Sequence, residues 1–231
     1  VTNTTPFLKY SFTVGMTAMS GRGFYYPTDT VFGKNGRLYV PNRGIPRVEQ
    51  GVRILMCDVD GGYYGNFGFR GEDGGQFMWP SNGAVDSEGL LYFTDEHSNR
   101  ISVFDESGEF VSKWGTYGSG EGELDGPSGI AFDGGDDLYV SDTYNHRIQR
   151  FNKSGRNLLS FGSEGDGDGQ FKLPWGLAVG GGGDVYVADW GNDRIQRFSP
   201  DGHFLASYGS SGRGDGELHR PASVAVDDDG Y

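Results

Sequence analysis

A repeat of 47 residues runs through most of this 231-residue chain and limits what it can fold into. Prolines recur at this spacing at Pro80, Pro127, Pro174 and Pro221. Four further sets keep the same step: Tyr92, Tyr139 and Tyr186; Asp95, Asp142 and Asp189; Arg100, Arg147 and Arg194; Phe104, Phe151 and Phe198. A period of about 40 to 50 residues is typical of propeller blades and related arrays. Each unit is therefore expected to be one supersecondary structure.

Each repeat contains four short apolar segments separated by turn residues. In the third unit these segments are residues 129–132, 138–142, 147–151 and 157–161. Their length and alternation predict antiparallel strands joined by hairpins, and four such strands form a propeller blade. The 42 glycines argue against long helices, because each interior glycine costs a helix about 1 kcal/mol relative to alanine. The sequence predicts an all-β fold.

The third and fourth units share the pattern P-x-G-[IL]-A-[FV]-x(4,6)-[LV]-Y-V-x-D-x(2)-N-x-R-I-Q-R-F. This pattern resembles the NHL repeat, and the resemblance extends over almost the whole chain. It implies a β-propeller of four-stranded antiparallel blades, commonly six in a ring. Function does not follow from it, since one fold hosts many activities.

The repeat register divides the chain as a single propeller domain, residues 1–231. We expect a fourth strand and inter-blade loop of the closing blade at 1–26, and the start of another repeat at 221–231. Four repeats lie between them, at 27–79, 80–126, 127–173 and 174–220. A six-bladed ring would need about 70 more residues, so an incomplete propeller is expected.

Composition narrows the partners. The formal charge of −13 repels phosphate backbones and anionic lipids, so nucleic acid is not an expected partner. No apolar stretch approaches the roughly 20 residues of a membrane span. A monomer is expected.

Cys57, the single cysteine, excludes an internal disulfide and aligns with Phe104, which predicts a core position. The cellular compartment stays open between secreted, periplasmic and cytoplasmic.

Aspartate and arginine recur together at the two ends of the hairpin between the second and third strands. Antiparallel pairing should bring each pair together, and a pattern present in every blade suits architecture better than a single active site. We therefore expect structural ion pairs at Asp95 and Arg100, Asp142 and Arg147, and Asp189 and Arg194.

The first unit breaks the repeat, because Pro27 precedes Pro80 by 53 residues. The six extra residues lie in the segment 42–52, which lengthens one loop between a second and a third strand. Loops that differ on a rigid repeat scaffold often carry specificity, so this loop is the first candidate binding site; the alternative is a tolerated surface insertion. Its candidate residues are Asn42, Arg43, Arg47 and Arg53, of which Arg43 and Arg47 would suit an acidic ligand.

The loops between second and third strands lie on the same face of the propeller as the inter-blade loops, and we call it the loop-rich face. Three aromatic residues are expected near it: Tyr144, Trp175 and Trp190. Their rings are expected to stack on a ligand or to fill space between blades. The favoured interpretation is a non-catalytic scaffold that binds a protein, peptide or glycan, with no catalytic residue, metal or cofactor.

Two alternatives remain. Some NHL-like enzymes, such as the lyase that completes peptide amidation, hold a metal with histidines inside the propeller, which makes a metal-dependent lyase or lactonase possible. The histidines here, His97, His146, His203 and His219, fall in loops and turns instead of inner strands. RNA binding would need a basic face, for which the candidates are Arg43, Arg47, Arg70, Arg213 and Arg220.

Overall fold

The computed structural model describes residues 23–45 and 51–227, whose strands form four separate four-stranded antiparallel sheets. The first contains β1 (Val31–Phe32), β2 (Leu38–Asn42), β3 (Arg53–Cys57) and β4 (Tyr63–Phe67). The second contains β5 (Pro80–Val85), β6 (Leu91–Asp95), β7 (Arg100–Phe104) and β8 (Phe110–Trp114). The third contains β9 (Pro127–Phe132), β10 (Leu138–Asp142), β11 (Arg147–Phe151) and β12 (Asn157–Phe161). The fourth contains β13 (Pro174–Val179), β14 (Val185–Asp189), β15 (Arg194–Phe198) and β16 (Phe204–Tyr208).

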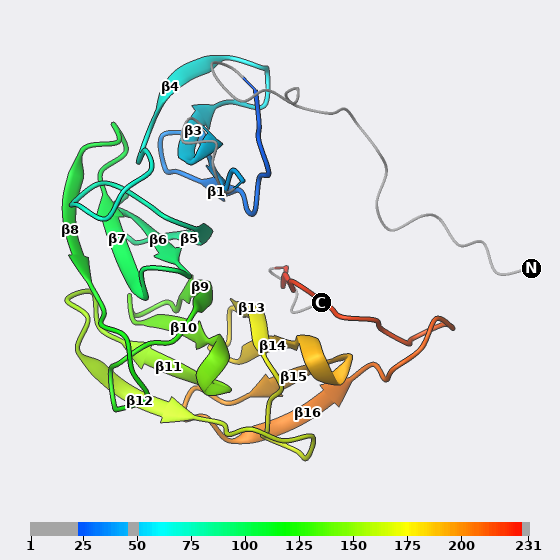
Figure 1. Cartoon of the computed structure of the whole chain (residues 1–231). Helices are drawn as coiled ribbons and strands as arrows, with labels where there is room; N and C mark the ends of the chain where they lie inside the picture. The colour runs from blue at the N-terminus through cyan, green and yellow to red at the C-terminus, as the bar shows by residue number, and fades with distance from the viewer. Residues whose placement is uncertain (1–22, 46–50, 228–231) are drawn as a thin grey trace, which may run out of the picture.

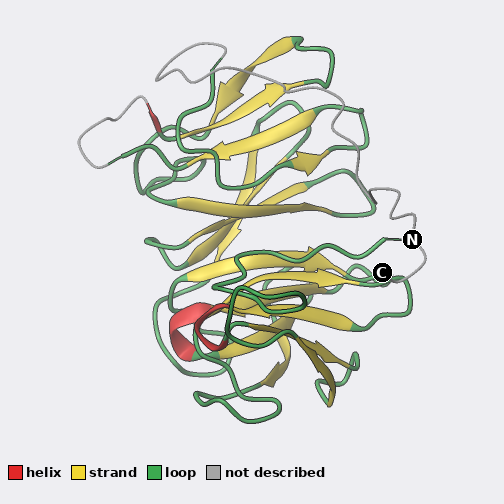
Figure 2. Ribbon diagram, turned by 90° about the vertical axis from the view of Figure 1, so that its right-hand side faces the viewer, coloured by secondary structure: helices red, strands yellow, loops and turns green. Residues whose placement is uncertain are grey.

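The four sheets are the blades of a propeller. In every sheet the strands follow chain order, and Figure 1 shows them side by side around a common centre, with β5, β9 and β13 toward the centre and β8, β12 and β16 at the rim. Figure 2 shows the same sheets stacked one after another. The short 3₁₀ turns η2 (Thr143–Asn145) and η3 (Trp190–Asn192) connect the second strand to the third in the third and fourth blades. The predicted all-β propeller of four-stranded blades is confirmed.

Apolar side chains from adjacent blades form one cluster at each interface. Between the first two blades Tyr39, Ile54 and Phe67 pack with Phe93 and Phe104. The corresponding clusters between the later blades contain Tyr92 with Ile130, and Tyr139 with Val187. Burial of apolar surface stabilises a folded protein by about 25 cal/mol per Å². The packing of each blade against the next is therefore the main contribution to the stability of the blades.

The repeated tyrosine of the second strand also makes a polar contact across the interface. Tyr39 donates its phenolic O–H to the carbonyl of Glu106 at 2.7 Å, and Tyr139 donates to the carbonyl of Pro200 at 3.1 Å. Each acceptor lies in the turn between the third and fourth strands of the next blade. Cys57 is buried beside Leu38 and Leu55, and burial raises the pKa of its thiol.

Inner strands approach one another closely at two repeated glycines. A Cβ on Gly129 would lie 2.3 Å from the carbonyl oxygen of Trp175, and one on Gly176 would lie 2.7 Å from that of Ala222. These contacts are with backbone of the next blade, which cannot move without separating the strands. Glycine is therefore required here by close approach.

We expect Gly129→Ala to destabilise the protein by about 1–3 kcal/mol through overpacking. Gly134→Ala is the matched control, because a Cβ there meets nothing within 4 Å; its effect should stay within about 0.5 kcal/mol. Urea unfolding of the two variants tests this. Equal midpoints would show that the inner strands separate easily.

Lys153 joins the second and third blades on the side opposite the loops between second and third strands. Its ammonium lies 3.1 Å from Asp86 and 2.9 Å from Asp136. The hydrogen bond from Lys153, with a second from Ser87, lowers the pKa of Asp136 to about 2. Folding therefore favours the ionised carboxylate of Asp136.

The folded pKa of Asp136 lies below the value of about 3.9 for an unfolded chain, so its contribution is complete above about pH 5 and is lost as the pH falls toward 2. Lys153→Met should reduce the fall in stability across this window, whereas Lys113→Met, with the same loss of charge, should not. Thermal unfolding at pH 2 to 5 measures it. Parallel pH profiles for wild type and Lys153→Met would contradict this assignment.

Candidate functional site at the central cavity

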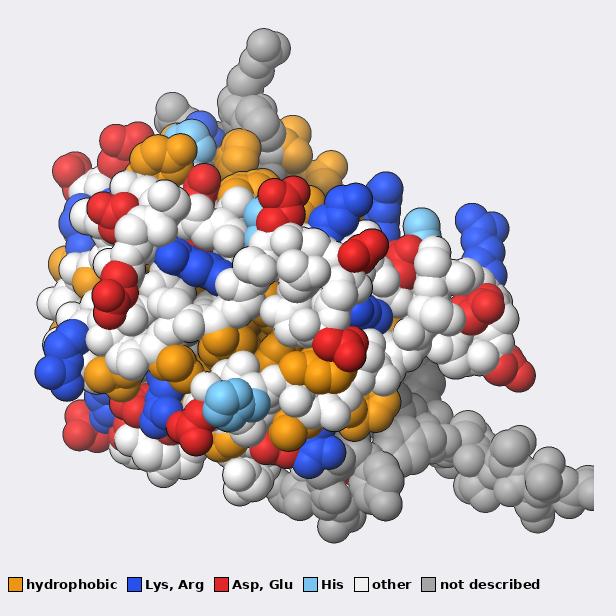
Figure 3. All heavy atoms as spheres, turned by 90° about the horizontal axis from the view of Figure 1, so that it is seen from below, with side chains coloured by type: hydrophobic (Ala, Val, Ile, Leu, Met, Phe, Trp, Pro, Cys, Tyr) orange, Lys and Arg blue, Asp and Glu red, His pale blue; other side chains and the backbone are white. Residues whose placement is uncertain are grey.

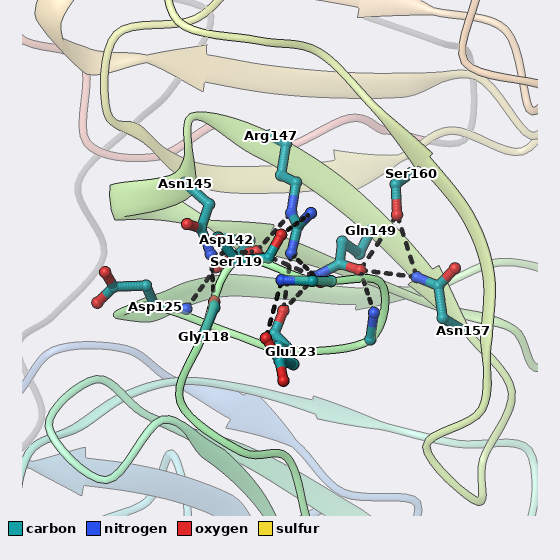
Figure 4. Close-up of polar contacts among 12 residues, drawn as sticks. Gly118, Ser119, Glu123, Asp125, Asp142, Asn145, Arg147, Gln149, Asn157 and Ser160 are labelled. Atoms are coloured by element: carbon teal, nitrogen blue, oxygen red, sulfur yellow. Dashed lines mark hydrogen bonds and ion pairs between the residues drawn. The ribbon is translucent and has the colours of Figure 1, made fainter.

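The repeated aspartate and arginine hold the inter-blade loops in place. In the third blade Arg147 Nε donates to Asp142 at 2.7 Å, and the guanidinium also donates to the carbonyls of Ser119, Gly120 and Glu123 (Figure 4). Asp142, Asn145 and Gln149 complete the network (Figure 4). Asp189 and Arg194 repeat the ion pair at 2.8 Å in the fourth blade.

The second blade differs from this expectation. Arg100 donates to the carbonyls of Glu72 and Gln76, and no ion pair joins it to Asp95 in the described part of the chain. Both carboxylate oxygens of Asp95 accept backbone N–H groups, from Met78, Trp79 and Ser98. The residues in place of Asn145 and Gln149 are Ser98 and Ser102, which are too short to orient the carboxylate; their buried hydroxyls have no partner within the described residues.

Asp142→Asn should destabilise the protein by about 2–4 kcal/mol, because it removes the charge that pairs with a buried arginine network. Asp201→Asn, in an exposed turn, removes the same formal charge and serves as control. Chemical denaturation of both variants provides the measurement. A loss below about 0.5 kcal/mol for Asp142→Asn would mean that the carbonyls alone hold Arg147.

The first blade carries the longer loop predicted as the leading site. Asn42 is fully buried, accepts the N–H of Tyr25 at 2.6 Å and donates to the carbonyl of Val40. Arg53 is 2% exposed and donates to the carbonyl of Gly23 at 2.7 Å. Both side chains are therefore internal and do not face a ligand. Arg47 lies outside the described residues.

Arg43 is exposed enough to reach a ligand, but it already has an anionic partner. Its guanidinium lies 2.8 Å from the buried carboxylate of Glu96 and 4.7 Å from the ring centroid of Trp79. Tyr144 donates its O–H to the other oxygen of Glu96 at 2.9 Å. These contacts link three blades, so the expected attraction of Arg43 for an acidic ligand is largely cancelled.

The other two predicted aromatic residues lie together. The rings of Trp175 and Trp190 are 6.3 Å apart, and the guanidinium of Arg220 lies 4.6 Å from the centroid of Trp190. Trp175 is on the inner strand β13, and Trp190 begins η3.

A cavity of about 200 Å³ lies where the inner strands begin. Its lining comes from three blades and from the start of the next repeat: Thr28, Asp29, Arg43, Ser81, Asn82, Trp175, Ala222 and Ser223. We call this the central cavity. Of the predicted binding residues, it brings together Arg43 and Trp175.

Sequence reasoning missed two residues of the central cavity. Asp29 and Asn82 occupy the inner-strand position that is Gly129 and Gly176 in the later blades. Asp29 accepts the N–H groups of Gly83 and Thr30, and burial raises the pKa of its carboxyl group. A comparison of equivalent positions for residues that differ, instead of residues that repeat, would have identified this pair.

A larger cavity, of about 400 Å³, lies against the fourth blade and is lined by Tyr186, Ile195, Tyr208 and Val224, among others. The residues equivalent to Tyr186 are Tyr92 and Tyr139, which are buried by the following blade. Since the equivalent surface is used for packing between the described blades, this cavity is a weaker candidate for a ligand site.

Three of the four histidines have contacts that explain them without a ligand. His146 accepts the N–H of Leu173 through Nδ1, as Asn99 accepts that of Gly126 at the equivalent position. His97 packs on the ring of Trp79, and His219 lies 3.7 Å from Asp193. The described residues contain no cluster of three His, Cys, Asp or Glu suited to a metal ion.

Comparisons place the chain among known folds. The model of the NHL repeat matches residues 124–151 and 171–198. No curated protein matches the chain in sequence. Among the helices of the described residues, none has the length and apolar character needed to cross a membrane.

Solved structures share the architecture. A catalytically inactive virginiamycin B lyase from Staphylococcus aureus with quinupristin is 22% identical, with a TM-score of 0.59, over 78% of this chain and 54% of its own. A streptogramin B lyase is 17% identical, with a TM-score of 0.59, over 80% and 55%. A putative gluconolactonase is 16% identical, with a TM-score of 0.63, over 88% and 68%. The chain spans about half the length of the two lyases, and these identities show the fold alone.

Proposed function

This chain is a β-propeller that carries NHL repeats, and we propose that it is a non-catalytic binding scaffold whose central cavity receives part of a protein, peptide or glycan. The proposal rests on one observation. Repeat positions that hold the blades together carry the same residue in each blade, whereas repeat positions at this cavity carry different residues. Arginine recurs at Arg53, Arg100, Arg147 and Arg194. By contrast, the residue after each blade proline changes from Thr28 to Ser81, Ser128, Trp175 and Ala222.

Differences of this kind favour a specific site, because a repeated scaffold needs the same contacts in each blade and a ligand does not. The repeat position of Arg43, which lines the cavity, differs in the same way and carries Glu96, Thr143 and Trp190 in the later blades. An aromatic ring among a few convergent polar groups is the usual composition of a ligand pocket. Trp175 supplies that ring, and Asp29 and Asn82 supply polar groups.

The proposal predicts that Trp175→Ala weakens binding at least about tenfold, since a large aromatic ring at the centre of an interface often contributes most of the affinity. Glycan and peptide arrays would first identify a ligand, and titration would then compare wild type with the variant. Tyr117→Ala is the matched control: this tyrosine is 71% exposed in an inter-blade loop and outside the cavity. Equal losses for both variants would place the ligand elsewhere.

The enzyme alternative is a metal-dependent lyase or lactonase, the kinds of activity named for several structural neighbours. Mass spectrometry of the array ligand after incubation separates it from the proposed function. An unchanged mass together with an unchanged chromatographic retention time supports binding alone, whereas a cleaved product, or a product of equal mass and different retention time, supports catalysis.

RNA binding has less support. Two of its candidate arginines, Arg43 and Arg220, lie over tryptophan rings, and Arg43 is also paired with Glu96. On the face drawn in Figure 3, acidic and basic side chains are interspersed instead of forming a basic patch. Phosphate binding favours a continuous positive surface, so a protein, peptide or glycan is the better proposal.

A further inference from the structure

Tryptophan rings on the loop-rich face already hold cations. The guanidinium of Arg43 lies 4.7 Å from the centroid of Trp79, and that of Arg220 lies 4.6 Å from the centroid of Trp190. Trp175 is the third tryptophan of this face, and no arginine or lysine of the described residues stacks on it. Since tryptophan is the aromatic residue that best attracts a cation, its ring can accept one from a ligand.

The central cavity also contains an anion without a cationic partner. Asp29 accepts the N–H of Thr30 at 2.8 Å and that of Gly83 at 2.9 Å, and no salt bridge reaches it from any described residue. The side chain of Asn82 also hydrogen-bonds to this carboxyl group. A carboxylate has about four acceptor positions, so these three bonds leave capacity for one from a ligand. Arg43, the other charged residue of the lining, is paired with Glu96. Asp29 therefore supplies the unbalanced charge of the cavity.

The position of Asp29 shows that this charge is not needed to build a blade. Glycine occupies the equivalent position at Gly129 and Gly176, where the next inner strand leaves no room for a side chain. At the first two blades the same position carries Asp29 and Asn82, both in the cavity lining. An ionisable group at the position of a structural glycine, in a cavity lining that also contains an aromatic ring, suits recognition better than packing.

We propose that the central cavity binds a basic side chain, arginine or lysine, of a peptide or protein, between the ring of Trp175 and the carboxylate of Asp29. The volume of about 200 Å³ corresponds to roughly seven water molecules at about 30 Å³ each, which is room for one side chain. The net charge of −13 also attracts a basic partner over long range. This inference rests on the proposed function and specifies its ligand.

The test compares probes of matched shape and different charge. N-acetyl-argininamide and N-acetyl-citrullinamide differ in the charge of the side-chain terminus, N-acetyl-lysinamide is the second cation, and glucose represents a glycan. Binding is followed by the indole N–H signals of Trp79, Trp114, Trp175 and Trp190 in nitrogen-15 NMR spectra, with the Trp175 signal assigned from Trp175→Phe. The wild-type comparison of probes depends on no folded variant.

The arginine probe should shift the Trp175 signal and bind at least about tenfold more tightly than the citrulline probe. The guanidinium can pair its charge with the carboxylate of Asp29 and interact as a cation with the ring of Trp175, whereas the neutral urea group of citrulline can only donate hydrogen bonds. Asp29→Asn should remove this preference, and Asp201→Asn, which removes the same charge in an exposed turn, should keep it. Added salt should weaken the arginine complex more than the citrulline complex.

Equal affinity for arginine and citrulline, or no shift of the Trp175 signal by either cation, would overturn the inference. Binding of glucose at Trp175 without charge preference would overturn it as well, while it would leave the proposed function intact. If array ligands bind equally to wild type and Trp175→Ala, the central cavity is not the site and the proposed function fails with it.

Discussion

Burial of each blade against the next is the interaction on which the rest of this structure depends. A four-stranded sheet has two faces, and one isolated blade cannot remove both from water. Phe67 and Phe104 pack across the first interface, and Tyr139 and Val187 pack across a later one. Stacking also brings the inner strands so close that Gly129 and Gly176 admit no side chain. The sequence therefore repeats because each blade must make the same packing contacts with the next.

This requirement also determines where a site can form. The aspartate and arginine at the ends of the second and third strands hold the inter-blade loops through carbonyl groups, so they recur in blade after blade. The rims of the inner strands lie outside this network. Residues there can differ where packing leaves room: one repeat position carries Arg43, Glu96, Thr143 and Trp190. Another carries Asp29 and Asn82 in the first two blades, although close approach requires glycine there in the next two.

The periodic part of the sequence was sufficient to predict the blades, their strands and the all-β fold, because every blade repeats the same contacts. The contacts of single blades were harder to predict. Asp95 accepts three backbone N–H groups instead of pairing with Arg100, a consequence of the short side chains at Ser98 and Ser102. The burial of Asn42 and Arg53 depends on the segment around Gly23 and Tyr25, which no repeat pattern describes.

The sign of the charge that the site offers to a ligand is the property that was hardest to predict from the sequence alone. Arg43 is a cation in an irregular loop, and by residue type it suggests an acidic ligand. In the structure Glu96, from the next blade, lies 2.8 Å away and cancels that charge, while Asp29 stands in the cavity with hydrogen bonds but no counter-ion among the described residues. Whether a charge attracts a ligand depends on which charges the fold has already paired, and pairing between blades is visible only in three dimensions. The same pairing inverts the ligand chemistry, from an anion at Arg43 to a cation at Asp29.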